Sequence, residues 1–369
     1  MSPTVTILVT GSLVAASCAL VGSFLVLRKM ALLGDAISHA VLPGIVLAFL
    51  LTGERSALPM VLGAGALGLV TVFLVELVHR SRRLAEDASI GVVFPALFSV
   101  GVLLIARYTS QVDLDLDCVL YGEIAYVPWD LWLVGDASLG PRALWVNGAV
   151  LLLDLAFVLL FYKELKLSTF DPALAASLGF SPVLLHYLLM GAVSVTVVGA
   201  FEAVGAILVV AMLVVPPATA YLLTDQLGRM LALAVALGVI SAVAGYAVAH
   251  ALDASIAGAM ASVAGFLFVL GLAASPRHGV VARAVRYRQL RSRLIRRIVL
   301  LHLREEGEPV PAGVVERRFG WPRKRLEGVL GELQGRGWLE REPGGLRLTP
   351  AGARAAEAAG GPELAHPLG

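Results

Sequence analysis

Charged side chains are scarce in this chain of 369 residues. Asp, Glu, Lys and Arg make up 15% of it and hydrophobic residues 58%, whereas a typical soluble domain has about 25% charged and about 45–50% apolar residues. This shortage of charge argues against a soluble globular enzyme. It indicates a chain that spends much of its length in a membrane.

Cysteine is also scarce. The two cysteines, Cys18 and Cys118, are too few for a disulfide framework, and neither belongs to a Cys-x-x-Cys pair that would indicate a zinc ribbon or a redox site. The apolar run at residues 5–27 has no basic segment before it and no short hydrophobic region leading to a cleavage site. We therefore expect a retained first membrane span and no removable signal peptide.

The charges that are present divide the chain in two. Residues 1–276 contain 11 Lys and Arg and 17 Asp and Glu, a net charge of −6. Residues 277–369 contain 18 Lys and Arg and 10 Asp and Glu, a net charge of +8. The predicted fold is an all-α polytopic membrane domain at 1–276, followed by a small basic α+β domain. We place a basic linker at 277–290, a winged-helix-like domain at 291–358 and a tail at 359–369.

Nine apolar runs approach the length of about 20 residues that a membrane span needs. They are residues 5–27, 31–51, 58–78, 88–106, 144–162, 183–201, 203–223, 230–250 and 256–275. Lys and Arg collect after every odd-numbered run, which predicts a multi-pass protein of the plasma membrane with its N-terminus outside and its C-terminal domain in the cytoplasm. An alternative has eight spans, one of them broken, because a single residue separates 183–201 from 203–223.

The long segment at residues 107–143 is acidic, as expected of an external loop. It contains the run Asp113-x-Asp115-x-Asp117, which could gather cations outside the membrane. We favour a plain solvated loop, because the run lacks the glycine and the terminal glutamate of an EF-hand.

Asp35 and His39 are the main candidates for chemistry inside the membrane. They stand four residues apart, so a helix places both on one face, and ionisable groups within a span are costly enough to suggest a function. A carboxylate with an imidazole suits Mn, Fe or Zn, although one of each is too few for a closed site and a second subunit would double the set. The alternative is structural, with Asp35 capping the second span and His39 donating to a carbonyl.

Other intramembrane candidates are weaker. Glu202 lies between two apolar runs beside glycines, where it could mark a break or a gate and is a minor candidate for metal binding. Asp154 could pair with a neighbouring helix. The Pro216-Pro217 pair must interrupt the backbone hydrogen bonding of its span.

Most of residues 1–275 resembles the membrane permeases of ATP-binding cassette (ABC) importers for manganese, zinc and iron. The resemblance is carried by the segments 28–44, 88–94, 101–105, 119–123 and 204–220. The first segment is the most specific, since it surrounds the Asp-x-x-x-His motif. In this family the Asp and His are implicated in metal coordination along the pathway, which implies that role for Asp35 and His39.

The resemblance also implies partners. The chain has no Gly-x-x-x-x-Gly-Lys-[Ser/Thr] loop, so the ATPase must be a separate subunit and this chain is not itself an enzyme. An external solute-binding protein and a second permease, identical or paralogous, are implied as well. The expected ATPase-coupling helix lies in 168–179, where Asp171 and Pro172 start it, Ala175 lies in its middle and Gly179 stops it. No permanently bound cofactor is expected, only the transported metal.

The basic tail begins with an arginine-rich stretch that suits the anionic lipid surface of the cytoplasmic leaflet. Helices at about 290–305, 311–319 and 322–336, a hairpin turning at 343–345, and a last helix resemble the winged-helix domains of diphtheria-toxin-repressor-type metal regulators. Arg323, Lys324 and Arg325 open the recognition helix, where they could contact phosphate. We favour docking or regulation over nucleic-acid binding, because the domain is tethered to a membrane and lacks the repressors' second half.

Three functions remain to be compared. The leading one is the permease of an ATP-driven importer, with manganese first and then iron or zinc, working by alternating access around Asp35 and His39. The second is a membrane-anchored transcription regulator, against which nine spans argue because one or two would suffice. The third is an ion-coupled secondary transporter, which would need no ATPase.

Overall fold

The computed structural model describes residues 2–52, 57–81, 84–108, 124–134, 137–275, 279–306, 309–319 and 323–360. The chain divides into two compact units, Met1–Gly279 and Val280–Gly369. The run at 113–117 that we considered for cation gathering lies outside the described residues, as does Cys118.

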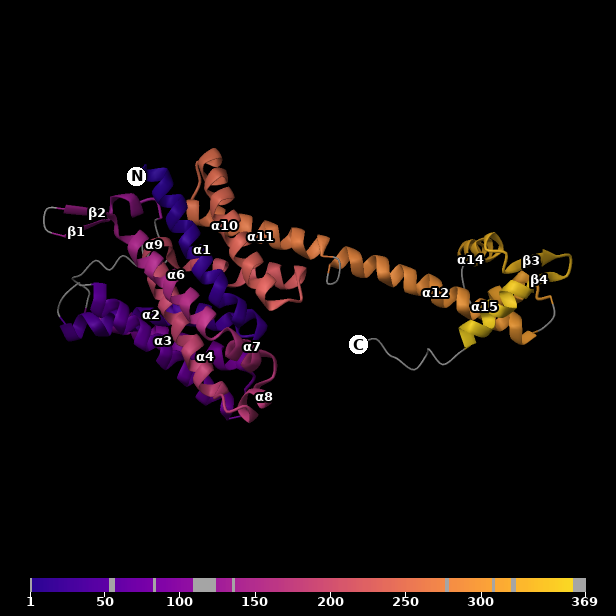
Figure 1. Ribbon diagram of the computed structural model, residues 1–369, viewed down its shortest axis with the longest axis horizontal. Coiled ribbons are helices and arrows are strands. Elements are labelled where there is room, and N and C mark those ends of the chain that lie inside the picture. The colour runs from indigo at the N-terminus through magenta and orange to yellow at the C-terminus, as the bar shows by residue number, and fades with distance from the viewer. Residues whose placement is uncertain are drawn as a thin grey trace. The chain divides into compact units, whose positions relative to one another are not determined.

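The first unit is a helical bundle (Figure 1). Its long helices are α1 (Pro3–Leu27), α2 (Ala31–Thr52), α3 (Ala57–Arg80), α4 (Glu86–Tyr108), α6 (Arg142–Leu160), α9 (Pro182–Leu223), α10 (Leu227–Leu252) and α11 (Ile256–Ala274). In the described part of the chain, these eight helices are long and apolar enough to cross a membrane. The polytopic helical membrane domain predicted from the sequence is therefore present.

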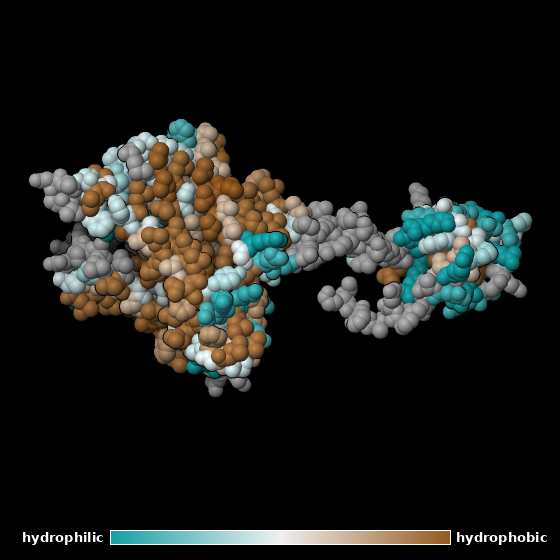
Figure 2. Space-filling model, in the orientation of Figure 1, coloured by the Kyte–Doolittle hydropathy of each residue, from teal (hydrophilic) through white to brown (hydrophobic). Residues whose placement is uncertain are grey.

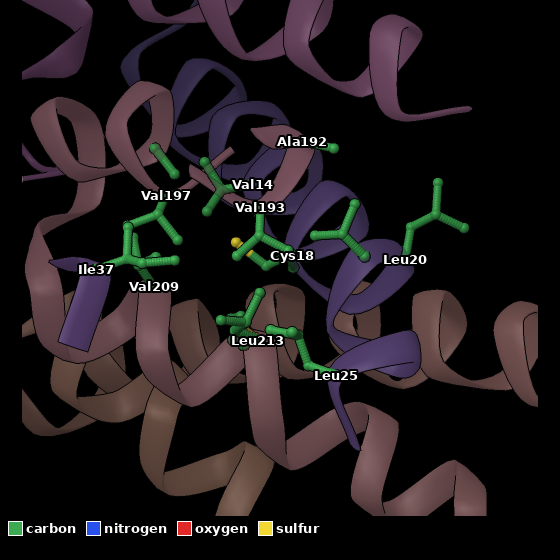
Figure 3. Close-up of a cluster of buried hydrophobic side chains, with 14 of the residues drawn as sticks. Val14, Cys18, Leu20, Leu25, Ile37, Ala192, Val193, Val197, Val209 and Leu213 are labelled. Atoms are coloured by element: carbon green, nitrogen blue, oxygen red, sulfur yellow. The ribbon is translucent and has the colours of Figure 1, made fainter. Parts of the chain in front are cut away.

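Helices α1 and α9 form the centre of the bundle. Figure 3 shows side chains of α1, α2 and α9 packed into one apolar cluster around Cys18. Gly22 of α1 allows the two helices to approach each other closely, because a Cβ at this position would overlap the carbonyl oxygen of Leu213 of α9. Small residues at such crossings let helices associate by direct packing where lipid provides no hydrophobic drive.

The two ends of the bundle are identified by hydrogen bonds. At one, the Arg28 end, the Arg28 guanidinium donates to the hydroxyls of Ser168 (2.9 Å) and Thr169 (3.2 Å). At the other, the Thr4 end, the Tyr246 hydroxyl donates to Thr4 Oγ1 at 3.2 Å. Helix α10 therefore runs antiparallel to α1.

Helix α9 begins and ends at the Arg28 end. Its first residue follows the short helix α8 (Pro172–Ser177), which packs on α7 (Tyr162–Phe170), the helix that Arg28 contacts. Near its other end, Ala220 packs in a cluster with Leu27 of α1. A straight helix of 42 residues would extend about 63 Å, so α9 must fold back. It does so at Gly205, whose φ of 77° and ψ of 166° are not helical.

Pro216 and Pro217 lie within α9, but the non-helical backbone of this helix is at Gly205. The two apolar runs that the sequence separates at residue 202 are thus the two halves of α9. The reversal depends on a glycine because φ near +77° is strained for residues with a Cβ.

The surface of the membrane unit is largely apolar. Figure 2 shows this as brown over most of the visible face, in contrast to the teal of the C-terminal unit. Large side chains such as Leu103, Leu152 and Phe266 are more exposed than buried. This pattern is expected where lipid chains, and not water, surround the protein.

Part of the expected external loop is ordered into regular structure. A short 3-10 helix η1 (Val127–Trp129) and an antiparallel pair, β1 (Leu131–Val134) and β2 (Ala137–Pro141), lead into α6. The sequence predicted only a loop here, because its acidic residues and turn formers masked the short strands.

The C-terminal unit contains α12 (Val280–Glu306), α13 (Ala312–Phe319), α14 (Arg323–Gly335), the hairpin β3 (Leu339–Glu342) and β4 (Gly345–Leu348), and α15 (Pro350–Gly360). Ile295, Val299 and Leu303 form one stripe of α12 and belong to a core with α14 and the hairpin. The helix starts at Val280, ten residues earlier than the sequence predicted. The expected linker at 277–290 is therefore helical from Val280 onward, because arginine is a good helix former.

Candidate metal centre

Asp35 and His39 lie in the first half of α2, close to the Arg28 end. The chain turns sharply between α1 and α2, where Lys29 has a φ of 62° and the Met30 amide donates to the Leu25 carbonyl at 2.9 Å. Because α2 starts at Ala31, the two side chains project from successive turns of one face. His39 Nε2 lies 3.5 Å from Asp35 Oδ1.

The imidazole is held by aromatic rings of α4. The His39 ring centroid lies 5.1 Å from that of Phe94 and 6.0 Å from that of Phe98. Helices α2 and α4 approach closely, since a Cβ at Gly101 would stand 2.7 Å from Pro43 Cδ. The α4 rings therefore limit the directions in which His39 can present its nitrogens to a metal.

This pair is not enclosed by its own chain. The Asp35 side chain is 43% exposed and that of His39 27%. Within the described residues, no group of three or more His, Cys, Asp and Glu side chains is close enough to hold a metal ion. One chain thus offers two donors on an open face of α2 and α4, and further ligands must come from elsewhere.

Glu202, the weaker metal candidate, is not brought to this pair. It lies in α9 three residues before the Gly205 reversal and faces Arg142, the first residue of α6, with 3.6 Å between Oε1 and Nη1. Because α6 ends next to α7 at the Arg28 end, Arg142 and Glu202 lie at the Thr4 end. The two metal candidates are thus at opposite ends of the bundle.

Asp154 has a structural partner instead. Its carboxylate is fully buried and accepts a hydrogen bond from the Thr196 hydroxyl of α9 at 2.7 Å. This confirms the predicted pairing with a neighbouring helix. The Ala192 carbonyl lies 2.8 Å from the same hydroxyl and shares its single proton with Asp154, so the pair is tied to the α9 backbone.

The segment expected to couple to an ATPase forms a short capped helix. Asp171 caps α8 by accepting from the Leu174 amide at 2.9 Å, Pro172 is its first residue, and Gly179 ends it with a φ of 88°. Ala175 is fully buried, so it anchors α8 to the unit and is not available to a partner.

The residues expected to contact nucleic acid start α14, which begins at Arg323. Their side chains lie outside those that the structure describes. No pattern in the sequence predicted that Arg28 contacts α7, 140 residues away, or that Thr196 donates a hydrogen bond to Asp154. Such pairings join residues far apart in the chain, and no local pattern marks them.

Comparison with known proteins settles the family. The model of the ABC 3 transport family matches residues 3–275. The chain belongs to this family. It is 49% identical over 280 residues to the manganese transport system membrane protein MntD of Bacillus subtilis, covering 76% of this chain and 95% of that one.

Two further relatives extend the comparison. The zinc transport system membrane protein TroD of Treponema pallidum is 43% identical over 361 residues, covering 96% of this chain and 98% of TroD, so this alignment includes the C-terminal unit. PsaBC from Streptococcus pneumoniae, solved in complex with a Fab, matches with a TM-score of 0.63 at 30% identity and covers 75% of this chain and 94% of that one.

Membership of the ABC 3 transport family makes the chain a membrane permease subunit of an ABC metal importer. It thereby disfavours the two alternatives, a membrane-anchored regulator and an ion-coupled secondary transporter. The relatives are named as membrane proteins of transport systems, in keeping with a subunit that relies on a separate ATPase.

Proposed function

We propose that this permease imports a divalent transition metal, manganese before iron or zinc, by alternating access around Asp35 and His39. The observation that carries the proposal is the placement of this pair on an open face of membrane helices. Ionisable groups within a membrane helix are costly, up to about 2.5–3.5 kcal/mol at its centre on insertion scales. A pair left exposed there needs a partner surface or a pathway.

A second permease subunit would provide that surface. Mn²⁺ prefers sites with about six ligands, mostly oxygens, and one chain offers Asp35 and His39 alone among the described residues. If two permeases meet through the α2 and α4 faces, two Asp and two His side chains surround one axis. The exposed Leu32, Val92 and Val100 on the same helices would be covered by the same contact.

The orientation follows from basic residues at the Arg28 end. Those that follow the odd-numbered spans are Arg28, Lys29, Arg80, Lys163, Lys166 and Arg229. By the positive-inside rule this end faces the cytoplasm. Because α9 passes through the bundle twice, the chain would cross the membrane nine times, which supports an N-terminus outside and a C-terminal unit in the cytoplasm.

Helix α8 would then dock on the ATPase. It lies at the cytoplasmic end. Exposed apolar side chains are present within it, at Leu174, and on both sides of it, at Phe170, Leu178 and Phe180. Lipid could cover such residues, but a short helix outside the spans, capped at both ends, is a rigid element suited to insertion into a partner groove. Asp171, Pro172 and Gly179 fix its ends, and buried Ala175 fixes it to the bundle.

Arg28 would carry the movement of this docking element to the metal. Its guanidinium bonds Ser168 and Thr169, immediately before α8, and burial lowers its pKa from the usual value, although arginine stays protonated in proteins. Three residues later α2 begins, and it bears Asp35 and His39. A shift of α7 and α8 on ATP binding is thus transmitted directly to the helix of the metal site.

An external solute-binding protein would deliver the ion to the Thr4 end. For the C-terminal unit we propose a winged-helix-like regulatory or docking role, since its order of helices and hairpin follows that fold. The backbone pairing of Val310 with Leu346 adds a third extended segment beside the hairpin, as a winged helix has.

Uptake by the reconstituted complex tests the proposal. We would measure radiolabelled manganese, zinc and iron uptake for the parent, Asp35→Ala and His39→Ala. Both variants are expected to lose transport while the complex still assembles. His79→Ala and Asp87→Asn, exposed residues near the cytoplasmic ends of α3 and α4, serve as matched controls. Full transport by the Asp35 and His39 variants would refute the site, and uptake with an inactive ATPase would refute the ABC mechanism.

A further inference from the structure

A cavity of about 200 Å³ opens at the Thr4 end of the bundle. Its walls come from η1 and the residues around it, from the first turns of α6 and from α9 just before the Gly205 reversal. A water molecule occupies about 30 Å³ in the liquid, so the cavity has room for a metal ion with several of its waters.

Three charged side chains line the cavity. Glu202 and Arg142 face each other at 3.6 Å, and both are partly exposed, 57% and 32%. Asp130 lines the same wall, and its carbonyl accepts a hydrogen bond from the Arg142 amide at 2.9 Å, which fixes the two segments together. With two carboxylates and one guanidinium, the cavity has a net charge of −1.

A buried amide supplies an independent sign of a ligand. Asn147, one turn into α6, lines the cavity and is only 1% exposed. Its Nδ2 donates to the Ala143 carbonyl at 2.9 Å, yet its Oδ1 accepts no hydrogen bond. Leaving a buried acceptor unsatisfied costs about 1–3 kcal/mol, so an uncoordinated oxygen at this place is informative.

We propose that this cavity is an outer, transient binding site for a hydrated divalent cation, with Glu202, Asp130 and Asn147 Oδ1 as its oxygen ligands. Carboxylate, amide carbonyl and water oxygens are the donors that Mn²⁺ favours. The identity of the ion as cargo, and the outward direction of this end, rest on the proposed function. The site itself is distinct from Asp35 and His39.

Arg142 has a defined task in this site. Without a cation it neutralises Glu202, and an entering cation must displace it. The guanidinium therefore lowers the affinity for the ion, which suits a site that has to pass the ion on. A site that held the metal tightly would delay transport, because conduction through successive sites requires each to release its ion.

Equilibrium binding of Mn²⁺ alone tests the proposal. The full-length permease carrying Asp35→Ala and His39→Ala would be titrated with Mn²⁺ in lipid nanodiscs, with free Mn²⁺ followed by its electron paramagnetic resonance signal. We expect saturable binding that Glu202→Gln weakens about tenfold or more, in the range found when groups around a metal are altered. Arg142→Gln is expected to strengthen it.

Asp253→Asn is the matched control. Asp253 is an exposed acid at the same end of the bundle, at the C-terminus of α10, and it does not line the cavity. Its substitution should leave binding unchanged. Equal effects of Asp253→Asn and Glu202→Gln would mean that the ion responds only to surface charge, which overturns the site.

Transport separates this proposal from the function proposed above. In the parent background, Glu202→Gln and Asn147→Leu should raise the KM for Mn²⁺ and leave the maximal rate largely unchanged, and thermal unfolding shows whether Asn147→Leu folds. Absence of saturable binding in the titration, together with an unchanged KM, would show that the cavity holds only water. The Asp35 and His39 variants would still decide the inner site by themselves.

Discussion

Two aspartates on membrane helices, Asp35 and Asp154, are in opposite environments. Asp154 is fully buried between α6 and α9, and the Thr196 hydroxyl donates to it. Asp35 is 43% exposed on the open face of α2, with His39 as its neighbour at 3.5 Å. Both are single acidic residues in apolar runs, so the sequence around them does not distinguish them. The structure does, because Asp154 is buried with a hydrogen-bond partner and Asp35 is exposed on the surface of the bundle.

The surrounding helices repeat this contrast. The α1 and α9 core is closed, with glycines at its crossings and an unbroken apolar cluster. The α2 and α4 face keeps exposed apolar residues around Asp35 and His39. We therefore expect substitutions in the core to change stability and substitutions on the open face to change transport.

The sharpest test is the same change at both aspartates. Asp35→Asn should lower manganese uptake by about 10–100-fold or more, because a neutral amide is a poorer metal ligand. Asp154→Asn should leave uptake within about twofold, since the amide oxygen still accepts from Thr196 and a neutral hydrogen bond contributes only about 1 kcal/mol. Uptake and thermal unfolding would be measured on both variants. A larger transport defect at Asp154 would reverse our assignment of the two roles.

The core should respond to a single methyl group. Gly22→Ala places a Cβ against the Leu213 carbonyl, and overpacking of this kind costs about 1–3 kcal/mol. Gly148→Ala in α6 is the matched control, because a Cβ there meets nothing within 4 Å. Thermal unfolding in detergent or nanodiscs measures the difference. Equal stability of the two variants would show that α1 and α9 are not packed as described.

Arg28 lies between α1 of the core and α2 of the open face. Its removal should change the coupling of ATP hydrolysis to metal import more than it changes the stability of the permease. Arg28→Ala deletes both hydrogen bonds to α7, so we expect less metal imported per ATP hydrolysed, by a few-fold, in reconstituted complexes. Arg28→Lys should recover part of the loss, because its ammonium can replace one of the two bonds. Lys166→Ala, an exposed cation on α7, is the control. An unchanged ratio in Arg28→Ala would exclude this link.

The smallest effect is expected from the C-terminal unit. The alignment with MntD spans 280 residues and takes up 95% of the MntD chain. Little of MntD therefore remains that could form a unit like the C-terminal one. A chain ending at Gly279 should therefore transport manganese within about twofold of the full chain at saturating metal. Any regulatory role would show as a changed response to the intracellular metal level. Loss of all uptake by an assembled, truncated complex would place the unit in the transport cycle itself.

The sequence was sufficient for those features that depend on local composition. Apolar runs predicted the membrane helices, and Asp-x-x-x-His placed Asp35 and His39 on one face. Asp171, Pro172 and Gly179 bounded α8 because capping residues act within a few positions.

What the sequence could not predict depends on contacts between distant segments. The reversal of α9 comes from the backbone angles of one glycine among many. Asn147 stands in an ordinary apolar run, and its unsatisfied oxygen becomes informative only when Asp130 and Glu202 are seen to line the same cavity. Asp35 is exposed because no other helix in the described part of the chain covers this face of α2. Such an arrangement depends on the packing of the whole bundle.

The reversal at Gly205 also has a mechanical consequence. The first half of α9 starts five residues after the last residue of α8. It reaches Glu202 at the far end of the bundle, about 30 Å away at 1.5 Å per residue. A rigid helix of this length would act as a lever, with one end next to α8 and the other in the wall of the cavity that Glu202 lines. A tilt of about 10° at the inner end would move the Glu202 end by about 5 Å over that length. If an ATPase docks on α8 as proposed, this one helix would link its movement to the width of the cavity at the Thr4 end.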